Sequence, residues 1–214
     1  MKLALIGATG GTGAHVLTAA LDHRHEVTVL VRDPERLGGP VKDRVRVVVG
    51  SATDRAPVHD LLTEADAVVS ALGPTSGEAD LHTRVAHTLV AEMSQRGPRR
   101  FVGVSAAGID VPGDDKTALN RMISFLIQRL GGAVVNDKPA EYAVWAASEL
   151  DWTLVRPPRL VDRPPTGHPV EHDAHRSTKS TSISRTELGQ FVIHVVEDDL
   201  YLRQAPFVAS RPKA

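Results

Sequence analysis

The sequence predicts an α/β fold in which a doubly wound parallel sheet is the middle layer of a three-layer sandwich. Short apolar runs alternate with helical patterns, glycines separate the first run from the first helix, and the runs contain few polar residues. Strands that alternate with helices pair in parallel through right-handed crossovers, and they are apolar because helices cover both faces. A length of 214 residues suits a single domain over residues 1–214.

Five strands and three helices are expected in the first half of the chain. The apolar runs that predict the strands are Leu3–Ile6, Glu26–Val31, Val45–Val49, Asp66–Leu72 and Phe101–Val104. The helical patterns between them span Ala14–Leu21, with a start near Thr12, then Val58–Glu64 and Ala79–Gln95. In the third pattern, Val85, Leu89 and Met93 recur at helical spacing, and Gly97-Pro98 ends it.

The second half is less regular and is expected to form a small C-terminal lobe, so that residues 106–214 supply most of the substrate side. A helix that runs to about Glu197 begins at Ser184, because Ser184 and Glu187 have the spacing of a capping box. Pro139 is expected in the first turn of another helix. The remaining expected elements are helices over Leu119–Leu130 and Pro139–Leu150, a strand over Trp152–Val155, a long loop over residues 162–180, and a final strand over Ala205–Val208.

The most informative stretch follows the first expected strand and reads Gly7-Ala8-Thr9-Gly10-Gly11-Thr12-Gly13. Glycine allows the backbone to approach a pyrophosphate closely, and free N–H groups at a helix N-terminus bind the anion. A strand before the glycines, a helix after them and a second strand about twenty residues further on together predict a dinucleotide site. The alternative is an ordinary turn between a strand and a helix.

The second expected strand ends at Arg32, where NAD-specific sites carry an acidic residue that binds the adenosine ribose. A guanidinium cannot accept those hydrogen bonds, but it can donate two of them to a 2′-phosphate. Arg32 therefore favours NADP(H) over NAD(H), although the adjacent Asp33 is an acidic competitor. The alternative is that Arg32 is a solvated strand end.

Further candidate residues follow other strands, because open parallel sheets bind ligands outside the carboxyl ends of their strands. Gly73 would let the backbone close on the ribose and nicotinamide side of the cofactor, and Ser105 is the polar group expected near the reactive ring. An alternative for Ser105 is a hydroxyl that caps the following turn. The candidate cofactor residues at these strand ends are Ser51, Ala52, Leu72, Gly73, Val104 and Ser105.

Composition excludes several classes of partner and chemistry. A formal net charge of −1 gives no overall field that would attract nucleic acid or acidic lipid, and no apolar run is as long as a membrane span. The first residues enter a strand directly, so no signal peptide is expected. The absence of cysteine rules out disulfides and thiol catalysis and suits a cytoplasmic protein. We expect a monomer or homodimer that acts on a small molecule.

An ordered set of motifs runs through nearly the whole chain: the glycine stretch, Val29-Leu30-Val31-Arg32, Ala71-Leu72-Gly73, Val104-Ser105 and Trp152-Thr153-Leu154-Val155-Arg156-Pro157-Pro158. This set resembles the atypical short-chain dehydrogenase/reductases, in particular the NAD(P)H-binding subgroup that includes flavin reductase/biliverdin reductase B and NmrA-like proteins. The resemblance implies a Rossmann-type fold and NADPH bound by the glycine loop, Thr12, Arg32, the Leu72-Gly73 turn and Ser105. It also puts Pro158 and Arg159 where flavin reductases have a proline and a histidine beside nicotinamide and substrate.

The chain departs from its relatives at residues that carry chemistry. Classical short-chain dehydrogenases use a Tyr-x-x-x-Lys pair whose tyrosine is a general acid. Neither Tyr142 nor Tyr201 has a lysine four residues later, which disfavours classical alcohol or ketone chemistry. Because Arg159 replaces the flavin reductase histidine, the substrate of that enzyme is not carried over. Ser51 stands where relatives often have an aspartate toward the adenine.

Two further groups of ionisable residues have an ordinary explanation. Lys138 and Glu141 are expected to be solvated charges near the start of a helix, with a role facing the cleft as the alternative. The histidines of the expected loop, His168, His172 and His175, lie near Asp173 and could hold a metal. The composition of the loop disfavours a helix that would align them, so no metal site is expected.

These observations favour an NADPH-dependent reductase that transfers hydride to a flat conjugated acceptor, a flavin or a quinone. Such an acceptor needs orientation more than a tyrosine acid, since solvent can supply the proton. Arg159 could offset negative charge on a reduced flavin or bind an acidic substrate group, with a surface salt bridge as the alternative. Two other functions stay open: a non-catalytic NADP-binding sensor of the NmrA type, and a nucleotide-sugar epimerase or dehydratase.

Overall fold

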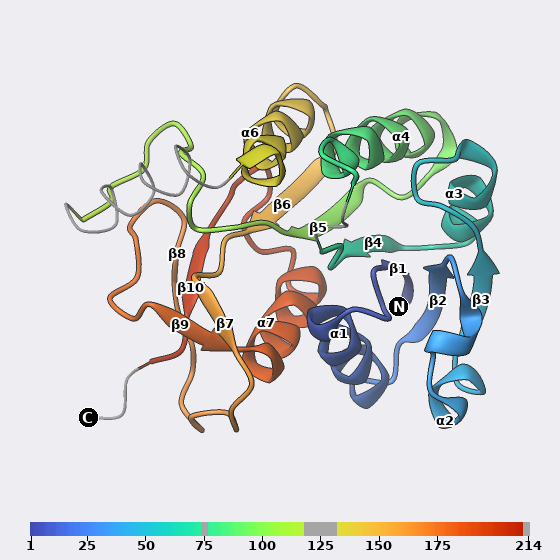
Figure 1. The fold of residues 1–214 in the computed structure, drawn as a ribbon, viewed down its shortest axis with the longest axis horizontal. Coiled ribbons are helices and arrows are strands. Elements are labelled where there is room, and N and C mark those ends of the chain that lie inside the picture. The colour runs from blue at the N-terminus through green and yellow to red at the C-terminus, as the bar shows by residue number, and fades with distance from the viewer. Residues whose placement is uncertain (74–76, 118–131, 212–214) are drawn as a thin grey trace.

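The computed structural model describes residues 1–73, 77–117 and 132–211, and its centre is a six-stranded sheet (Figure 1). All strand pairs in this sheet are parallel, in the order β3-β2-β1-β4-β5-β6. The strands are β1 Lys2–Ile6, β2 Glu26–Val31, β3 Arg46–Val49, β4 Ala67–Ser70, β5 Arg100–Val104 and β6 Asp151–Val155. The strand order reverses between β1 and β4, which is where doubly wound sheets bind ligands.

Helices cover both faces of the sheet, as the sequence predicts (Figure 1). The helices α1 Gly11–Asp22 and α7 Arg185–Glu197 pack on one face, and α3 Arg55–Leu62, α4 Leu81–Arg96 and α6 Gly132–Ala146 lie on the other. Alternate residues of β1 enter the two cores: Leu3 and Leu5 pack with α1 and α7, whereas Ala4 and Ile6 pack with α3 and α4. This alternation explains why the strands are almost wholly apolar.

Short elements complete the chain and correct one sequence expectation. They are the 3₁₀-helix η1 Pro34–Arg36, the helix α2 Gly39–Lys42, and the strands β7 Arg159–Val161, β8 Glu171–Asp173, β9 Ser182–Ser184 and β10 Phe207–Ala209. β7 pairs with β9 in parallel, and β8 pairs with β10 in antiparallel. The expected loop over residues 162–180 therefore contains the strand β8, whereas the expected final strand over Ala205–Val208 is present as β10, shifted toward Ala209. Pairs of three-residue strands leave no periodic pattern in the sequence.

The expected helix over Pro139–Leu150 is wrong in its limits, because α6 begins at Gly132 and ends at Ala146. Pro139 lies inside this helix instead of in its first turn. An internal proline costs a helix about 3 kcal/mol, and packing of α6 against α4 outweighs that cost here. The helix expected over Leu119–Leu130 falls almost wholly on residues 118–131, which lie outside the described part of the chain.

The capping box at the start of α7 is confirmed. Ser184 Oγ accepts a hydrogen bond from the backbone N–H of Glu187, and the Glu187 carboxylate accepts one from the backbone N–H of Ser184. Burial alone would raise the pKa of Glu187, but hydrogen bonds from Ser210, Thr166 and Ser184 outweigh burial and lower this pKa to about 2. The first turn of α7 is therefore tied to residues before and after it in the chain.

A buried ion pair supports the end of β6. The guanidinium of Arg156 is fully buried and donates two hydrogen bonds to the Asp114 carboxylate, at 2.7 and 2.6 Å. It also stacks over the Phe207 ring at 3.8 Å and donates to the carbonyl of Ala205. Arg156 directly follows β6, and its contacts join the segment around Asp114 to Phe207 of β10.

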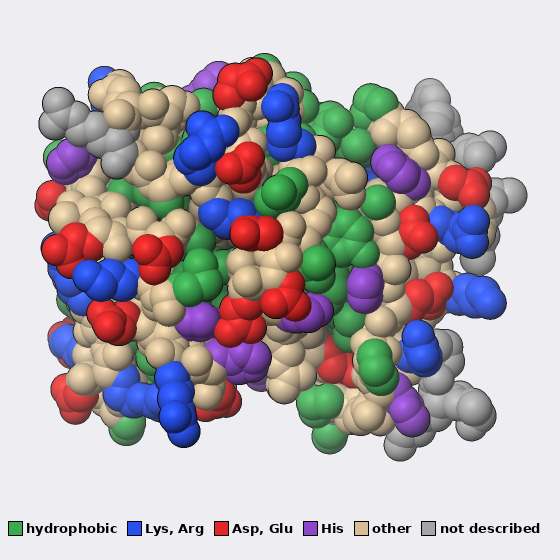
Figure 2. Space-filling view, turned by 180° about the vertical axis from the view of Figure 1, so that it is seen from behind, with side chains coloured by type: hydrophobic (Ala, Val, Ile, Leu, Met, Phe, Trp, Pro, Cys, Tyr) green, Lys and Arg blue, Asp and Glu red, His purple; other side chains and the backbone are tan. Residues whose placement is uncertain are grey.

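On the face in Figure 2, acidic and basic side chains are interspersed. None of the helices in the described residues has both the length and the hydropathy that a membrane-spanning helix needs.

Candidate functional site

Two glycines of the loop after β1 are required by the packing of the protein itself. Gly7 has φ +85°, and a Cβ there would lie 2.7 Å from the carbonyl of Ala71 at the end of the neighbouring β4. A Cβ on Gly13 would lie 1.9 Å from the Gly7 carbonyl oxygen. These glycines therefore allow the loop to lie directly against the turn that follows β4.

The remaining glycines leave the start of α1 open to a ligand. Gly10 is the N-cap of α1 and supplies no side-chain hydrogen bond to the first turn. Gly10 and Gly11 are exposed, and Thr9 and Thr12 are half-buried. An uncapped helix N-terminus with small, exposed residues around it fits a pyrophosphate, whose oxygens would accept hydrogen bonds from the free N–H groups.

Arg185, the first residue of α7, is a residue at this site that the sequence analysis missed. A Cβ on Gly11 would lie 3.3 Å from Arg185 Nε, so the guanidinium lies beside the glycine loop. Arg185 also pairs with Asp162 at 2.6 Å. The sequence shows that Arg185 follows the capping residue Ser184 and so begins a helix. It does not show that α7 packs against α1, and this packing brings Arg185 to the loop.

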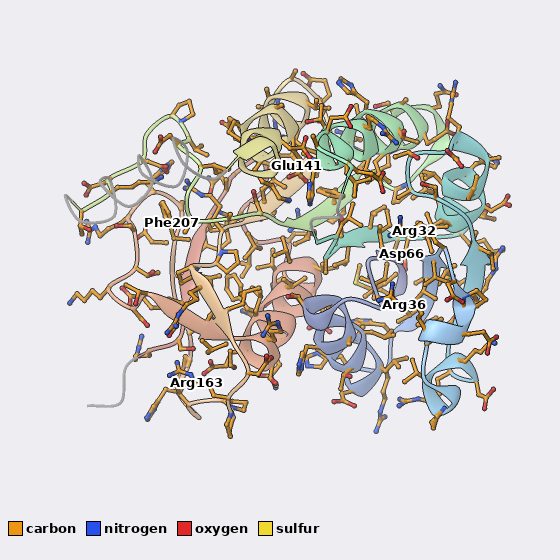
Figure 3. The ribbon with its side chains drawn as sticks, in the orientation of Figure 1. Arg32, Arg36, Asp66, Glu141, Arg163 and Phe207 are labelled. Carbon is orange, nitrogen blue, oxygen red and sulfur yellow. The ribbon has the colours of Figure 1, made fainter. Side chains whose placement is uncertain are left out.

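Arg32 directly follows β2, next to the glycine loop, and its side chain is 61% exposed (Figure 3). Its guanidinium lies 3.3 Å from one carboxylate oxygen of Glu78. The other oxygen of that carboxylate lies 3.9 Å from Arg84. Both arginines thus lie near one half-buried carboxylate, while their own side chains stay exposed. This arrangement leaves the Arg32 guanidinium available to a phosphate group.

The residues after β3 form a closed turn. Ser51 Oγ lies 2.8 Å from Thr53 Oγ1 and accepts a hydrogen bond from the Thr53 backbone N–H. Ala52 is half-buried against the core around α3 and α4. Ser51 is therefore already bonded within its own turn, so any adenine contact there has to come from the backbone or compete with Thr53.

The Leu72-Gly73 turn after β4 is held by a buried histidine that the sequence analysis did not identify. His82 Nε2 lies 3.2 Å from the Leu72 carbonyl, and His82 Nδ1 lies 2.9 Å from the Asp137 carboxylate. Asp137 also accepts the backbone N–H groups of His82 and Thr83 at the start of α4, and His82 and Asp137 are both buried. Two helices thereby fix the turn beside the glycine loop.

The packing of the described residues leaves room for a side chain at Gly73, so a substitution there can test cofactor binding without disturbing the fold. No described atom lies within 4 Å of a Cβ built on Gly73. Gly73→Val is therefore expected to change the free energy of unfolding by no more than about 0.5 kcal/mol, yet to weaken cofactor binding at least about tenfold by filling the space for the ribose. Calorimetry with NADPH and urea unfolding measure the two effects.

The control for this variant is Gly38→Val, since Gly38 also has no described atom within 4 Å of a built Cβ and lies before α2. It should leave both quantities unchanged. Unaltered NADPH affinity in Gly73→Val would remove Gly73 from the site.

Ser105, Val104 and Lys138 meet at the end of β5. Ser105 is 8% exposed, and its hydroxyl has no hydrogen-bond partner in the described part of the chain, so it does not cap the following turn. Lys138 Nζ donates to the Val104 carbonyl at 3.3 Å and pairs with the Glu141 carboxylate at 2.8 Å. A buried hydroxyl without a partner is a hydrogen-bonding group that a ligand could satisfy.

The expectation that Lys138 and Glu141 are solvated charges is wrong. Glu141 is 6% exposed, and the Lys138 side chain is 14% exposed (Figure 3). Because α6 begins seven residues before Pro139, these residues lie inside the helix, on the side that faces β5. A half-buried lysine beside the end of β5 is thus part of the candidate site.

Pro158 and Arg159 lie after β6, further from the glycine loop along the sheet. Pro158 is half-buried, and Arg159 is an exposed residue at the start of β7. The backbone N–H of Ala107 donates to the Pro157 carbonyl, which joins this segment to the one after β5. In the described residues Arg159 has no ion-pair partner, so the surface salt bridge considered for it is not formed.

Both tyrosines of the chain are engaged away from the glycine loop. Tyr142 packs edge-on against Trp152, and burial raises its pKa, which makes it a poorer acid. Tyr201 bonds through its hydroxyl to His172. His168 lines a surface hollow with His172, and His175 contacts Gly113, so the three loop histidines have different surroundings.

Residues 7–199 match the NAD(P)H-binding family. YwnB from Bacillus subtilis, an uncharacterized protein, is 29% identical over 108 residues, which make up 50% of this chain and 48% of YwnB; the chain thus matches about half the length of that relative. A short-chain dehydrogenase/reductase from Veillonella parvula in complex with NADP is 20% identical, with a TM-score of 0.81 over 98% of this chain and 94% of that one.

ChuY from Escherichia coli O157:H7, an anaerobillin reductase, is also 20% identical, with a TM-score of 0.81 over 100% of this chain and 99% of that one. At these identities the two structures show that the fold is shared.

Proposed function

This chain belongs to the NAD(P)H-binding family, and we propose that it is an NADPH-dependent reductase of a flavin or a quinone. The observation that carries the proposal is the combination of an open dinucleotide cradle with the absence of a tyrosine acid. The two tyrosines of the chain are engaged with Trp152 and His172. A flat conjugated acceptor needs no such acid, since solvent can supply the proton.

Residues at the carboxyl ends of β1, β2 and β4 would hold the cofactor. The backbone N–H groups at Gly11 and Thr12 would bind the pyrophosphate, with Arg185 beside them. Arg32 would exchange Glu78 for the 2′-phosphate, to which it can donate two hydrogen bonds. The open space over Gly73 would accept the ribose. When bound, NADPH supplies the hydride from its nicotinamide ring.

The residues after β5 and β6 would orient the reacting rings. The Ser105 hydroxyl, buried and without a partner in the described residues, would hydrogen-bond the nicotinamide side of the cofactor. Lys138 would hold the Val104 carbonyl and keep a positive charge at the same edge. Arg159, exposed and without an ion pair among the described residues, would stabilise negative charge on the reduced acceptor.

A screen of NADPH oxidation with FMN, riboflavin and menadione, followed by stopped-flow absorbance, tests this function. We expect at least one acceptor to be reduced, and Arg159→Gln to lower kcat/KM for it about tenfold. Arg163→Gln is the matched control, because Arg163 is an exposed arginine four residues further along (Figure 3). Tight NADPH binding without turnover of any acceptor would contradict the reductase and favour the redox sensor.

A further inference from the structure

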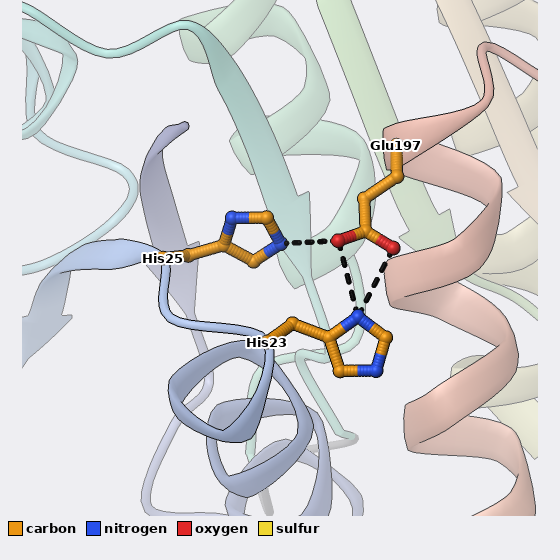
Figure 4. Close-up of side chains that lie close together, drawn as sticks. All are labelled: His23, His25 and Glu197. Carbon is orange, nitrogen blue, oxygen red and sulfur yellow. Dashed lines mark hydrogen bonds and ion pairs between the residues drawn. The ribbon is translucent and has the colours of Figure 1, made fainter.

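Three side chains that could bind a metal, His23, His25 and Glu197, lie close together (Figure 4). His23 is the C-cap of α1, His25 directly precedes β2, and Glu197 is the last residue of α7. Both α1 and α7 begin beside the glycine loop. Their C-terminal ends therefore bring these residues together at the amino end of β2, on the opposite side of the molecule from the loop. The cluster is therefore independent of the proposed reductase site.

The three side chains are spaced as ligands of one metal ion would be. His23 Nδ1 lies 3.1 Å from each oxygen of the Glu197 carboxylate, and His25 Nε2 lies 3.0 Å from Oε1. All three ligand atoms lie within 4.8 Å of one another. Bonds of about 2.0–2.2 Å to zinc put neighbouring ligand atoms roughly 3.0–3.5 Å apart, so little movement would be needed.

His25 offers the most informative nitrogen. Its side chain is 6% exposed, and its buried Nε2 atom, although close to Glu197, forms no hydrogen bond of ordinary geometry in the described residues. The other ring nitrogen, Nδ1, lies 3.4 Å from the amino group of Met1. Nε2 is therefore the nitrogen turned toward the cluster.

The backbone between the two histidines explains why both rings face α7. Arg24 adopts a left-handed conformation with φ +62°, unusual for a residue other than glycine. The N–H groups of Arg24 and His25 donate to the carbonyls of Leu21 and Ala20, and so close the end of α1. This tight turn puts two residues that are separated by one position on the same side of the chain.

We propose that His23, His25 and Glu197 form a zinc site that joins the α1–β2 turn to the end of α7. Imidazole and carboxylate ligands suit zinc, and two neutral imidazoles with one carboxylate leave a net negative charge for a divalent cation. The His23 and Glu197 side chains are 45% and 29% exposed, so water can complete the tetrahedral coordination from the solvent side.

Calorimetric titration of zinc chloride into chelator-treated full-length protein tests the site. We expect one zinc ion per chain, and at least tenfold weaker binding in His23→Ala and in Glu197→Gln. His23 is an exposed side chain, so its replacement keeps the fold, which circular dichroism verifies. The control is His194→Ala, since His194 lies on the same helix and pairs only with Asp198 among the described residues.

Zinc should also raise the melting temperature of the wild-type protein and of His194→Ala, but not of Glu197→Gln. Absence of zinc binding in the wild-type protein, or wild-type zinc affinity in His23→Ala and in Glu197→Gln, would overturn the proposal and leave the cluster as a set of ion pairs. The measurements need no cofactor, so their result does not depend on the proposed reductase activity.

Discussion

Replacing Arg156 with leucine is expected to lower the free energy of unfolding by about 3 to 5 kcal/mol, the cost of leaving a buried charge without its partner. The Asp114 carboxylate is 8% exposed and accepts two hydrogen bonds from the Arg156 guanidinium. Among the described residues, leucine would leave that carboxylate with only the Val111 backbone N–H at 3.0 Å and the Lys116 ammonium at 3.9 Å as partners, and would remove the guanidinium that stacks over the Phe207 ring. Urea unfolding followed by circular dichroism measures the loss.

The control is Arg159→Leu, three residues away on an exposed position of β7. It should change the free energy of unfolding by less than about 0.5 kcal/mol. If Arg156→Leu were as stable as this control, the buried ion pair would not be needed to hold the segment around Asp114 against β10.

Replacing Arg32 with alanine is expected to raise the dissociation constant of NADPH about tenfold to a hundredfold. Hydrogen bonds to charged groups contribute roughly 1.5–3 kcal/mol, which corresponds to that range. NADH lacks the 2′-phosphate, so its affinity should change by less than about twofold, and the preference for NADPH should be lost. Calorimetry or fluorescence titration with both cofactors measures the difference.

Arg36→Ala is the control for this variant, because Arg36 is an exposed arginine in the adjacent η1 helix (Figure 3). It should leave both affinities unchanged. An equal loss for NADPH and NADH in Arg32→Ala would mean that Arg32 supports the loop without contacting the 2′-phosphate.

The main fold was predictable from the sequence because its signals are local. The apolar run of β1, the glycine stretch after it and the Ser184–Glu187 capping box each act within a few residues. The small strands were not predictable, because β7 and β8 are three residues long and find their partners only across the fold. The limits of α6 were wrong because packing against α4 outweighs the cost of Pro139.

Candidate site residues divide in the same way. Those at strand ends, such as Arg32 and Ser105, could be named because parallel strands bring their carboxyl ends to one edge. His82 and Arg185 reach that edge through contacts between helices that are distant in sequence. The charge of Lys138 gave no sign of its burial, since burial depends on which side of α6 faces β5.

From local patterns alone, the chain is predicted to form a doubly wound parallel sheet with a glycine loop at the carboxyl end of its first strand, and Arg32 is predicted to bind a 2′-phosphate. These follow from local rules of glycine conformation, apolar patterning and helix capping. The folded structure was needed to see that Asp137 and His82 fix the Leu72-Gly73 turn and that Glu197 lies beside His23, 174 residues away. Such contacts depend on which helix faces pack together, and that packing is a property of the whole folded chain.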